Sequence, residues 1–180
     1  MLAIEKLDAA NELFYLLLWD NPALAQQCFA AFKATVDEDV DDVTEWPELS
    51  EPLRTALRPV LLYREWDELD VMLDDLQEQV RRRRLAIRFY ATDSNNDIEQ
   101  DDEDDDEPAY SFDDTDEFFA QINDVLIEDG FNLWSWETES GALCVFIAQA
   151  QDRETIYHLA YMLGFHDDSG AAMRCCDVVG

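Results

Sequence analysis

The chain has 180 residues, of which 43 are Asp or Glu and 12 are Lys or Arg, giving a formal net charge of -31 at pH 7. A negative field of this size repels nucleic acids and anionic membrane surfaces, and it attracts basic proteins and cations. The charge does not indicate disorder, because hydrophobic residues make up 48% and aromatic residues 12% of the sequence. We therefore expect a folded protein with a sizeable apolar core and an acidic surface.

No targeting segment or membrane span is predicted. The first 20 residues are interrupted by charges, and they lack the basic start and the small-residue cleavage site of a signal peptide. The longest uncharged apolar run there, residues 13–19, is too short to cross a bilayer. Four cysteines, at 28, 144, 175 and 176, have spacings that indicate no disulfide framework. We expect free thiols and a cytoplasmic protein.

Residues 1–83 are predicted to be a helical region, since apolar side chains recur there at helical spacing. Pro22 suits the first turn of the second helix, and Pro59 is expected to shorten or kink the third. Residues 37–50 are acidic and are expected to form a loop. The fourth helix ends in four arginines, residues 81–84, which complement its dipole.

Residues 84–180 are predicted to form an α+β domain. Alternating apolar residues or short apolar runs indicate strands, and apolar residues at helical spacing followed by Gly130 and Gly164 indicate helices. A turn at residues 137–141 joins two of the strands in a hairpin. The expected strands are 85–90, 131–136, 142–148 and 173–179, and the expected helices are 113–129 and 152–163.

The resulting order, β-α-β-β-α-β, predicts a ferredoxin-like fold, in which two helices cover one face of a four-stranded antiparallel sheet. Trp134 and Trp136 share one face of their strand. We expect the N-terminal helices to cover that face, because a helical region of this size must bury its apolar stripes. The alternative is an open aromatic face that binds a ligand, as in RNA-recognition domains.

The most acidic stretch, at about residues 93–110, is predicted to be a solvated, disordered loop. Its start has the ligand spacing of a calcium-binding EF-hand loop, with acidic or amide residues at 93, 95, 97 and 99. However, Ile98 stands where that loop needs glycine, and Asp104 stands where it needs glutamate. We expect calcium to bind weakly at most.

Other motifs predict no metal, cofactor or catalytic site. The spacing of His158, His166, Cys175 and Cys176 matches no standard zinc pattern. No order of nucleophile and base stands out, and a chain with only five glycines offers no phosphate-binding loop. For the arginines at 81–84, we favour ion pairs within the protein over nucleic-acid binding, because the surrounding field opposes a polyanion.

Several segments resemble an uncharacterised family of acidic bacterial cytosolic domains. Residues 61–70 read Leu-Leu-Tyr-Arg-Glu-Trp-Asp-Glu-Leu-Asp and precede a helix. Later, Ile-Asn-Asp-Val-Leu at 122–126 and Gly-Phe-Asn-Leu at 130–133 lead to Glu-Thr-Glu-Ser-Gly-Ala at 137–142. A helix that opens at Arg153 then closes on Leu163-Gly164-Phe165. The resemblance implies a helical N-terminal part and a strand-turn-strand-helix unit, but no catalytic residues.

The helix–Gly–strand pattern of residues 125–165 is also similar to that of acidic regulators that bind and inhibit ribonuclease E. With the charge, this similarity favours a non-enzymatic protein that binds a basic partner protein, as an inhibitor or immunity-type protein of a nuclease or nucleic-acid-binding protein does. The alternatives are an enzyme or metal-dependent domain with an unrecognised site, and a salt-adapted protein whose acidic residues only hold water. The predicted contact residues are Asp37, Glu38, Asp39, Asp41, Asp42, Asp101, Asp102, Glu103, Asp104, Asp105, Asp106 and Glu107.

Overall fold

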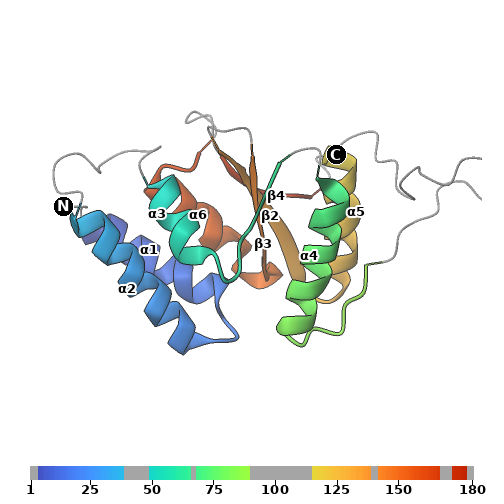
Figure 1. The fold of residues 1–180 in the computed structure, drawn as a ribbon, viewed down its shortest axis with the longest axis horizontal. Coiled ribbons are helices and arrows are strands. Elements are labelled where there is room, and N and C mark those ends of the chain that lie inside the picture. Colours follow the sequence, from blue (N-terminus) through green and yellow to red (C-terminus); the bar gives the residue numbers. More distant parts are fainter. Residues whose placement is uncertain are drawn as a thin grey trace, which may run out of the picture.

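The structure, a computed structural model, describes residues 4–38, 49–65, 68–89, 115–138, 142–166 and 172–177. These residues form an α+β fold of three layers, in which a four-stranded antiparallel sheet lies between two groups of helices (Figure 1). Helices α1 (Ile4–Leu17), α2 (Pro22–Glu38), α3 (Ser50–Leu57) and α6 (Arg153–Leu163) lie on one side. Helices α4 (Leu69–Arg82) and α5 (Thr115–Glu128) lie on the other.

The N-terminal helices form where the apolar spacing predicts them. Asn21 caps α2, since its side-chain oxygen accepts a hydrogen bond from the amide of Leu24 at 3.1 Å. Helix α3 ends two residues before Pro59, whose ring nitrogen cannot donate the next helical hydrogen bond. The predicted helical region, 1–83, also contains a short strand, β1 (Leu62–Arg64), so the sheet draws on both parts of the chain.

The predicted hairpin is confirmed. Strands β2 (Phe131–Glu137) and β3 (Leu143–Gln149) pair antiparallel along their whole length. The last strand, β4 (Met173–Cys175), pairs with β2 and is shorter than the expected 173–179, of which residues 178–179 lie outside the described residues. The strand order is β1-β3-β2-β4, with β1 and β4 at opposite edges.

The finer ferredoxin-like prediction is not confirmed. Residues 85–89 form no strand, and β1 takes the place of the expected first strand, ahead of α4 rather than after it. Residues 85–89 are instead held by Gln77 of α4, whose side chain accepts from the amide of Phe89 at 3.0 Å and donates to the carbonyl of Ile87 at 3.4 Å. The side-chain amide of Gln77 thus forms the hydrogen bonds with the main chain that a neighbouring strand would form in a sheet.

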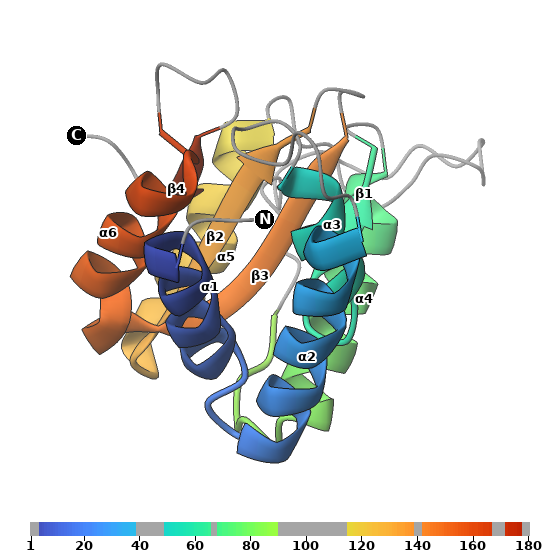
Figure 2. The same ribbon diagram turned by 90° about the vertical axis from the view of Figure 1, so that its left-hand side faces the viewer.

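Helices cover both faces of the sheet, not one face as predicted. The strand order explains why. Strand β1 is parallel to β2, and β3 is parallel to β4, so each connection crosses one intervening strand. The connection from β1 to β2 and the connection from β3 to β4 both lead toward the edge of the sheet that holds β4. Their starting strands, β1 and β3, are antiparallel to each other. Because such crossovers are right-handed, their helices fall on opposite faces (Figure 2).

Alternate residues of the central strands feed two cores. Trp134, Trp136 and Phe146 pack with α1, α2, α3 and α6, whereas Val145 and Ile147 pack with α4 and α5. Both tryptophans are fully buried, at 0% and 1% exposure. The expectation that the N-terminal helices cover this aromatic face is therefore confirmed, and within the described residues the face is closed to a ligand.

The arginines at the end of α4 form contacts within the fold. Arg81 and Arg82 both pair with Glu78, which confirms the predicted pairing at the helix end. Arg83 donates to the carbonyl oxygens of Leu17 at 2.7 Å and Ile147 at 3.1 Å. Its guanidinium also lies 4.1 Å from the centre of the Trp19 ring. Arg83 therefore joins α4 to the end of α1 and to β3.

Candidate functional site

The predicted acidic contact residues fall in two groups. Asp37 and Glu38 lie in the last turn of α2 rather than in the predicted loop. The helix extends that far because its apolar stripe continues to Val36, which is fully buried. The other predicted residues lie outside the described residues: Asp39, Asp41, Asp42, Asp101, Asp102, Glu103, Asp104, Asp105, Asp106 and Glu107.

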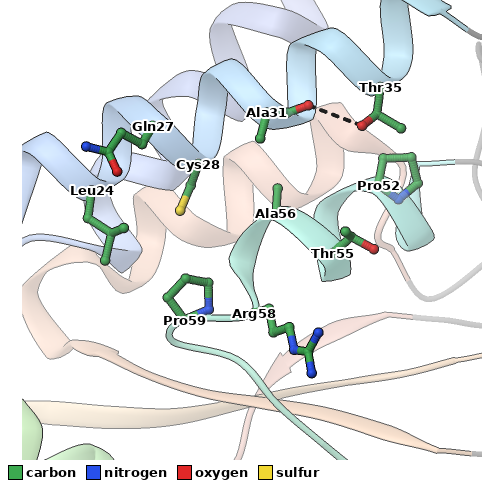
Figure 3. Close-up of a pocket in the computed structure, with 10 residues that line it drawn as sticks. All are labelled: Leu24, Gln27, Cys28, Ala31, Thr35, Pro52, Thr55, Ala56, Arg58 and Pro59. Atoms are coloured by element: carbon green, nitrogen blue, oxygen red, sulfur yellow. Dashed lines mark hydrogen bonds between the residues drawn. The ribbon is translucent and has the colours of Figure 1, made fainter.

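Two hollows flank α3 in the described part of the chain. The first, which we name the α2–α3 groove, has a volume of about 460 Å³ and is lined by residues such as Leu24, Cys28, Ala31, Pro52, Ala56 and Pro59 (Figure 3). The second, the arginine cleft, has a volume of about 550 Å³ and is lined by Glu51, Arg54, Arg58, Tyr63, Arg64 and Asp75, among others. Thr55 and Arg58 line both hollows.

The α2–α3 groove is mainly apolar. Leu24, Cys28, Ala31 and Thr35 follow each other at helical spacing, which places them on one face of α2. Cys28 is the nucleophilic residue there, and its sulfur points toward α3 (Figure 3). Burial raises the pKa of the Cys28 thiol, so the thiol stays protonated at neutral pH. The groove thus offers apolar contact but no activated nucleophile.

The remaining buried thiols are equally unsuited to nucleophilic chemistry. Burial raises the pKa of Cys144 to about 12 and that of Cys175 to about 11. Reactive cysteines have the opposite shift, because the thiolate is the nucleophile. All four cysteines are free, as predicted from their spacing.

The arginine cleft lies where α3, β1 and α4 meet. Arg54 and Arg58 are one helical turn apart on α3, so their side chains project from the same face. Arg54 is bound to Glu51 and lies 4.2 Å over the ring of Tyr63. Burial works to lower the pKa of Arg54, but its hydrogen bond to Glu51 and the charge of Glu51 outweigh this effect, and the pKa is raised.

The other two arginines of the cleft differ in their partners. Arg64, in β1, forms an ion pair with Asp75 of α4 and donates to the carbonyl of Tyr63 at 3.2 Å. Arg58, the C-cap of α3, is exposed and forms no ion pair with the described residues. Among the described lining residues, three arginines and two carboxylates give a local charge of about +1 by simple counting, opposite in sign to the protein as a whole.

The arginine cleft was not predicted from the sequence. One feature of the sequence could have indicated it: Arg54 and Arg58 are four residues apart in a predicted helix, in a chain with few basic residues. Arg64 follows after a proline and belongs to a strand of three residues, which no periodic pattern reveals. Only the fold brings Asp75 to the same place.

Metal-ligating residues are not gathered in the described part of the chain. No group of three or more His, Cys, Asp or Glu side chains lies there in a position to hold a metal ion. His158 is exposed on α6, His166 lies beside the ring of Tyr161, and Cys176 contacts the hydroxyl of Ser135. Cys175 is buried, and its backbone amide donates to the hydroxyl of Tyr157 at 3.2 Å. The four candidate zinc ligands thus have different neighbours. Among the described residues, no helix has the length and apolar character that a membrane span needs.

Comparison with protein-family models identifies the family of this chain. A family model described as a domain of unknown function, DUF6630, matches residues 9–168. The chain belongs to this family. The match includes residues 61–165, on which the resemblance to acidic bacterial domains rests, and the description names no function. No curated protein and no solved structure matches the chain. The function of this DUF6630 chain is therefore argued from its own residues.

Proposed function

We propose that this protein is a non-enzymatic binding protein whose acidic surface engages a basic partner protein. The use of the positive charges within the fold carries the proposal. Within the part of the chain that the structure describes, five of the 12 basic residues form ion pairs, and these pairs use four carboxylates. Arg83 is occupied by backbone carbonyls and by the ring of Trp19. With 43 acidic and 12 basic residues in the chain, the carboxylates outnumber the cations that could pair with them by more than three to one.

Some acidic residues stand at the C-terminal ends of helices, where a negative charge weakens the helix. Asp37 and Glu38 occupy the last turn of α2, and Glu128 and Asp129 stand at the end of α5. Neither helix has a basic residue in its last turn. A negative charge at a helix C-terminus opposes the helix dipole and costs roughly 0.3–1 kcal/mol. Helix stability does not explain these residues, whereas recognition of a cationic surface does.

The most concrete form of the proposal is an inhibitor or immunity-type protein of a nuclease or another nucleic-acid-binding protein. Carboxylates held on a folded surface would pair with the Lys and Arg side chains that otherwise meet phosphate groups. The field of the whole protein would speed association, because long-range charge acts mainly on the on-rate. The same field disfavours direct binding to DNA or RNA.

The test uses paired charge reversals. A partner is captured from a cell extract at low salt and released at high salt, and its association rate with the purified protein is then measured. The variant carries Asp37→Lys and Glu38→Lys in the last turn of α2. The control carries Asp74→Lys and Asp124→Lys, which makes the same charge change at exposed positions of α4 and α5, on the other side of the sheet from α2. We expect the first variant to lower the association rate by roughly tenfold and the control by much less.

Two results would overturn the proposal. One is an association rate that falls equally in both variants, which would show that only the net charge matters and that α2 makes no contact. The other is retention of DNA or RNA by the protein itself at low salt, where repulsion between two polyanions is strongest.

A further inference from the structure

The arginine cleft is a half-enclosed hollow at the free edge of the sheet. Strand β1 is an edge strand, and α3 and α4 flank it from the two faces. The cleft opens between them, with a volume of about 550 Å³. Small-molecule sites in proteins have roughly 300–1,000 Å³. The cleft therefore has the size of a ligand site.

The cleft concentrates positive charge in a protein that has little of it. Three of the 12 basic residues line it, in a chain of net charge -31. Glu51 and Asp75 each neutralise one arginine, and Arg58 is left over. An arginine guanidinium presents a planar fork of N–H groups that matches carboxylate and phosphate oxygens. One uncompensated arginine suits a ligand group with a single negative charge.

Arg64 adds a second observation. One terminal nitrogen binds Asp75 and the other donates to the carbonyl of Tyr63, so both ends of its fork are occupied. Its Nε is buried and has no hydrogen-bond partner among the described residues. A buried donor without an acceptor is destabilising, because it has lost its hydrogen bond to water. An oxygen atom of a ligand would accept this hydrogen bond if the side chain of Arg64 shifted enough to expose the Nε to the cleft.

We propose that the arginine cleft binds a small molecule through an oxyanion group, either a carboxylate or a phosphate. Arg58 supplies the free guanidinium, and the Nε of Arg64 supplies a second donor when its side chain shifts toward the ligand. Arg54, which contacts Tyr63 and Glu51, lines one side of the cleft. Binding of an oxyanion in this cleft does not depend on the acidic surface proposed to bind a partner.

The test titrates the whole protein, labelled with ¹⁵N, with sodium phosphate and, separately, with sodium acetate. Ionic strength is fixed at about 0.15 M, where the Debye length of about 8 Å confines the field to nearby charges. The Nε–H signal of Arg64, identified by its loss in Arg64→Lys, should shift and saturate with a Kd on the order of 1 mM. The backbone amide signal of Tyr63 provides a second readout that needs no variant.

Matched variants separate the cleft from the overall charge. We expect Arg58→Gln to weaken binding by roughly three- to tenfold, because it removes one charged hydrogen-bonding group. Arg88→Gln makes the same charge change at an exposed position outside the cleft and should leave the affinity unchanged. Saturation by phosphate alone assigns phosphate-bearing ligands, and saturation by acetate alone assigns carboxylic acids. Signals that drift without saturating in both titrations, or equal losses in the two variants, overturn the proposal.

Discussion

Arg84 stands in a backbone conformation that suits glycine better than arginine. Its φ is +57°, and among the non-glycine residues described it alone has a positive φ. The chain there closes α4 with a Schellman motif, in which Leu85 donates to the carbonyl of Val80 at 3.0 Å and Arg84 donates to that of Arg81 at 3.1 Å. This position usually holds glycine, because a Cβ atom is strained in the left-handed region.

Arg84→Gly should therefore stabilise the protein, by roughly 0.5–1 kcal/mol. The expected observation is a higher midpoint of urea unfolding with an unchanged slope. Arg84→Ala is the control, because it removes the same charge and keeps the Cβ atom. Equal gains in the two variants would attribute the effect to charge and contradict the backbone argument.

Buried polar residues mark the limit of prediction for single positions. The apolar spacing of α5 correctly places Phe118, Ile122 and Leu126 in the core. It gives no reason to place Asn123 there, yet Asn123 is fully buried, and its side-chain oxygen accepts from the amide of Leu133 at 2.8 Å. Helix α5 is thus bound to β2 by a side chain whose polarity predicts exposure. This contact depends on a residue ten positions further along the chain, and the apolar periodicity of a single helix carries no information about that residue.

At the scale of elements, the sequence predicts the extended segments and helices better than their pairing. The alternation at residues 85–90 correctly predicts a buried Ile87 and an exposed Arg88, but the side chain of Gln77, not a strand, takes up the main chain there. Strand β1 has only three residues, too few for an alternating pattern to be seen. Residue patterns also do not specify which edge of the sheet β4 joins. The position of β4 beside β2 determines that α6 lies on the opposite face of the sheet from α5.

The junction at Arg83 should contribute more to stability than its neighbours on α4. Arg83→Met removes two hydrogen bonds to backbone carbonyls and a contact with Trp19, and we expect a loss of roughly 1–3 kcal/mol in the free energy of unfolding. Arg82→Met removes only an exposed ion pair with Glu78, and we expect a loss of at most about 0.5 kcal/mol. Urea unfolding of the two variants makes the comparison. Similar losses would mean that charge at the helix end, and not the junction, is what matters.

At the scale of the whole molecule, composition predicted an apolar core under an acidic surface, and the two described cores agree. It could not locate a site. Asp37 and Glu38 belong to a helix, and the remaining predicted contact residues lie outside the described ones. The arginine cleft depends on α3, β1 and α4 meeting at one sheet edge. A net charge describes the field far from the surface, whereas a ligand site depends on a few charges brought together by folding.

The net charge of -31 should make stability depend on salt at low ionic strength. Raising NaCl from about 0.01 M to about 0.15 M shortens the Debye length from about 30 Å to about 8 Å, which screens repulsion among the carboxylates. We expect the thermal midpoint to rise by roughly 3–6 °C, as it would for about 1–2 kcal/mol in a protein of this size.

A variant with fewer charges separates screening from other effects of salt. Glu128→Gln with Asp129→Asn removes two exposed carboxylates from the end of α5, where they oppose the helix dipole. Its midpoint should be higher than that of the unaltered protein at 0.01 M NaCl and should rise less as salt is added.

Sodium sulfate at equal ionic strength should give the same rise as chloride, since screening depends on ionic strength and not on the identity of the salt. A midpoint that is flat up to 0.15 M and rises only in molar salt would instead indicate that the carboxylates serve hydration, as in a salt-adapted protein. That result would remove the main electrostatic argument for a basic partner.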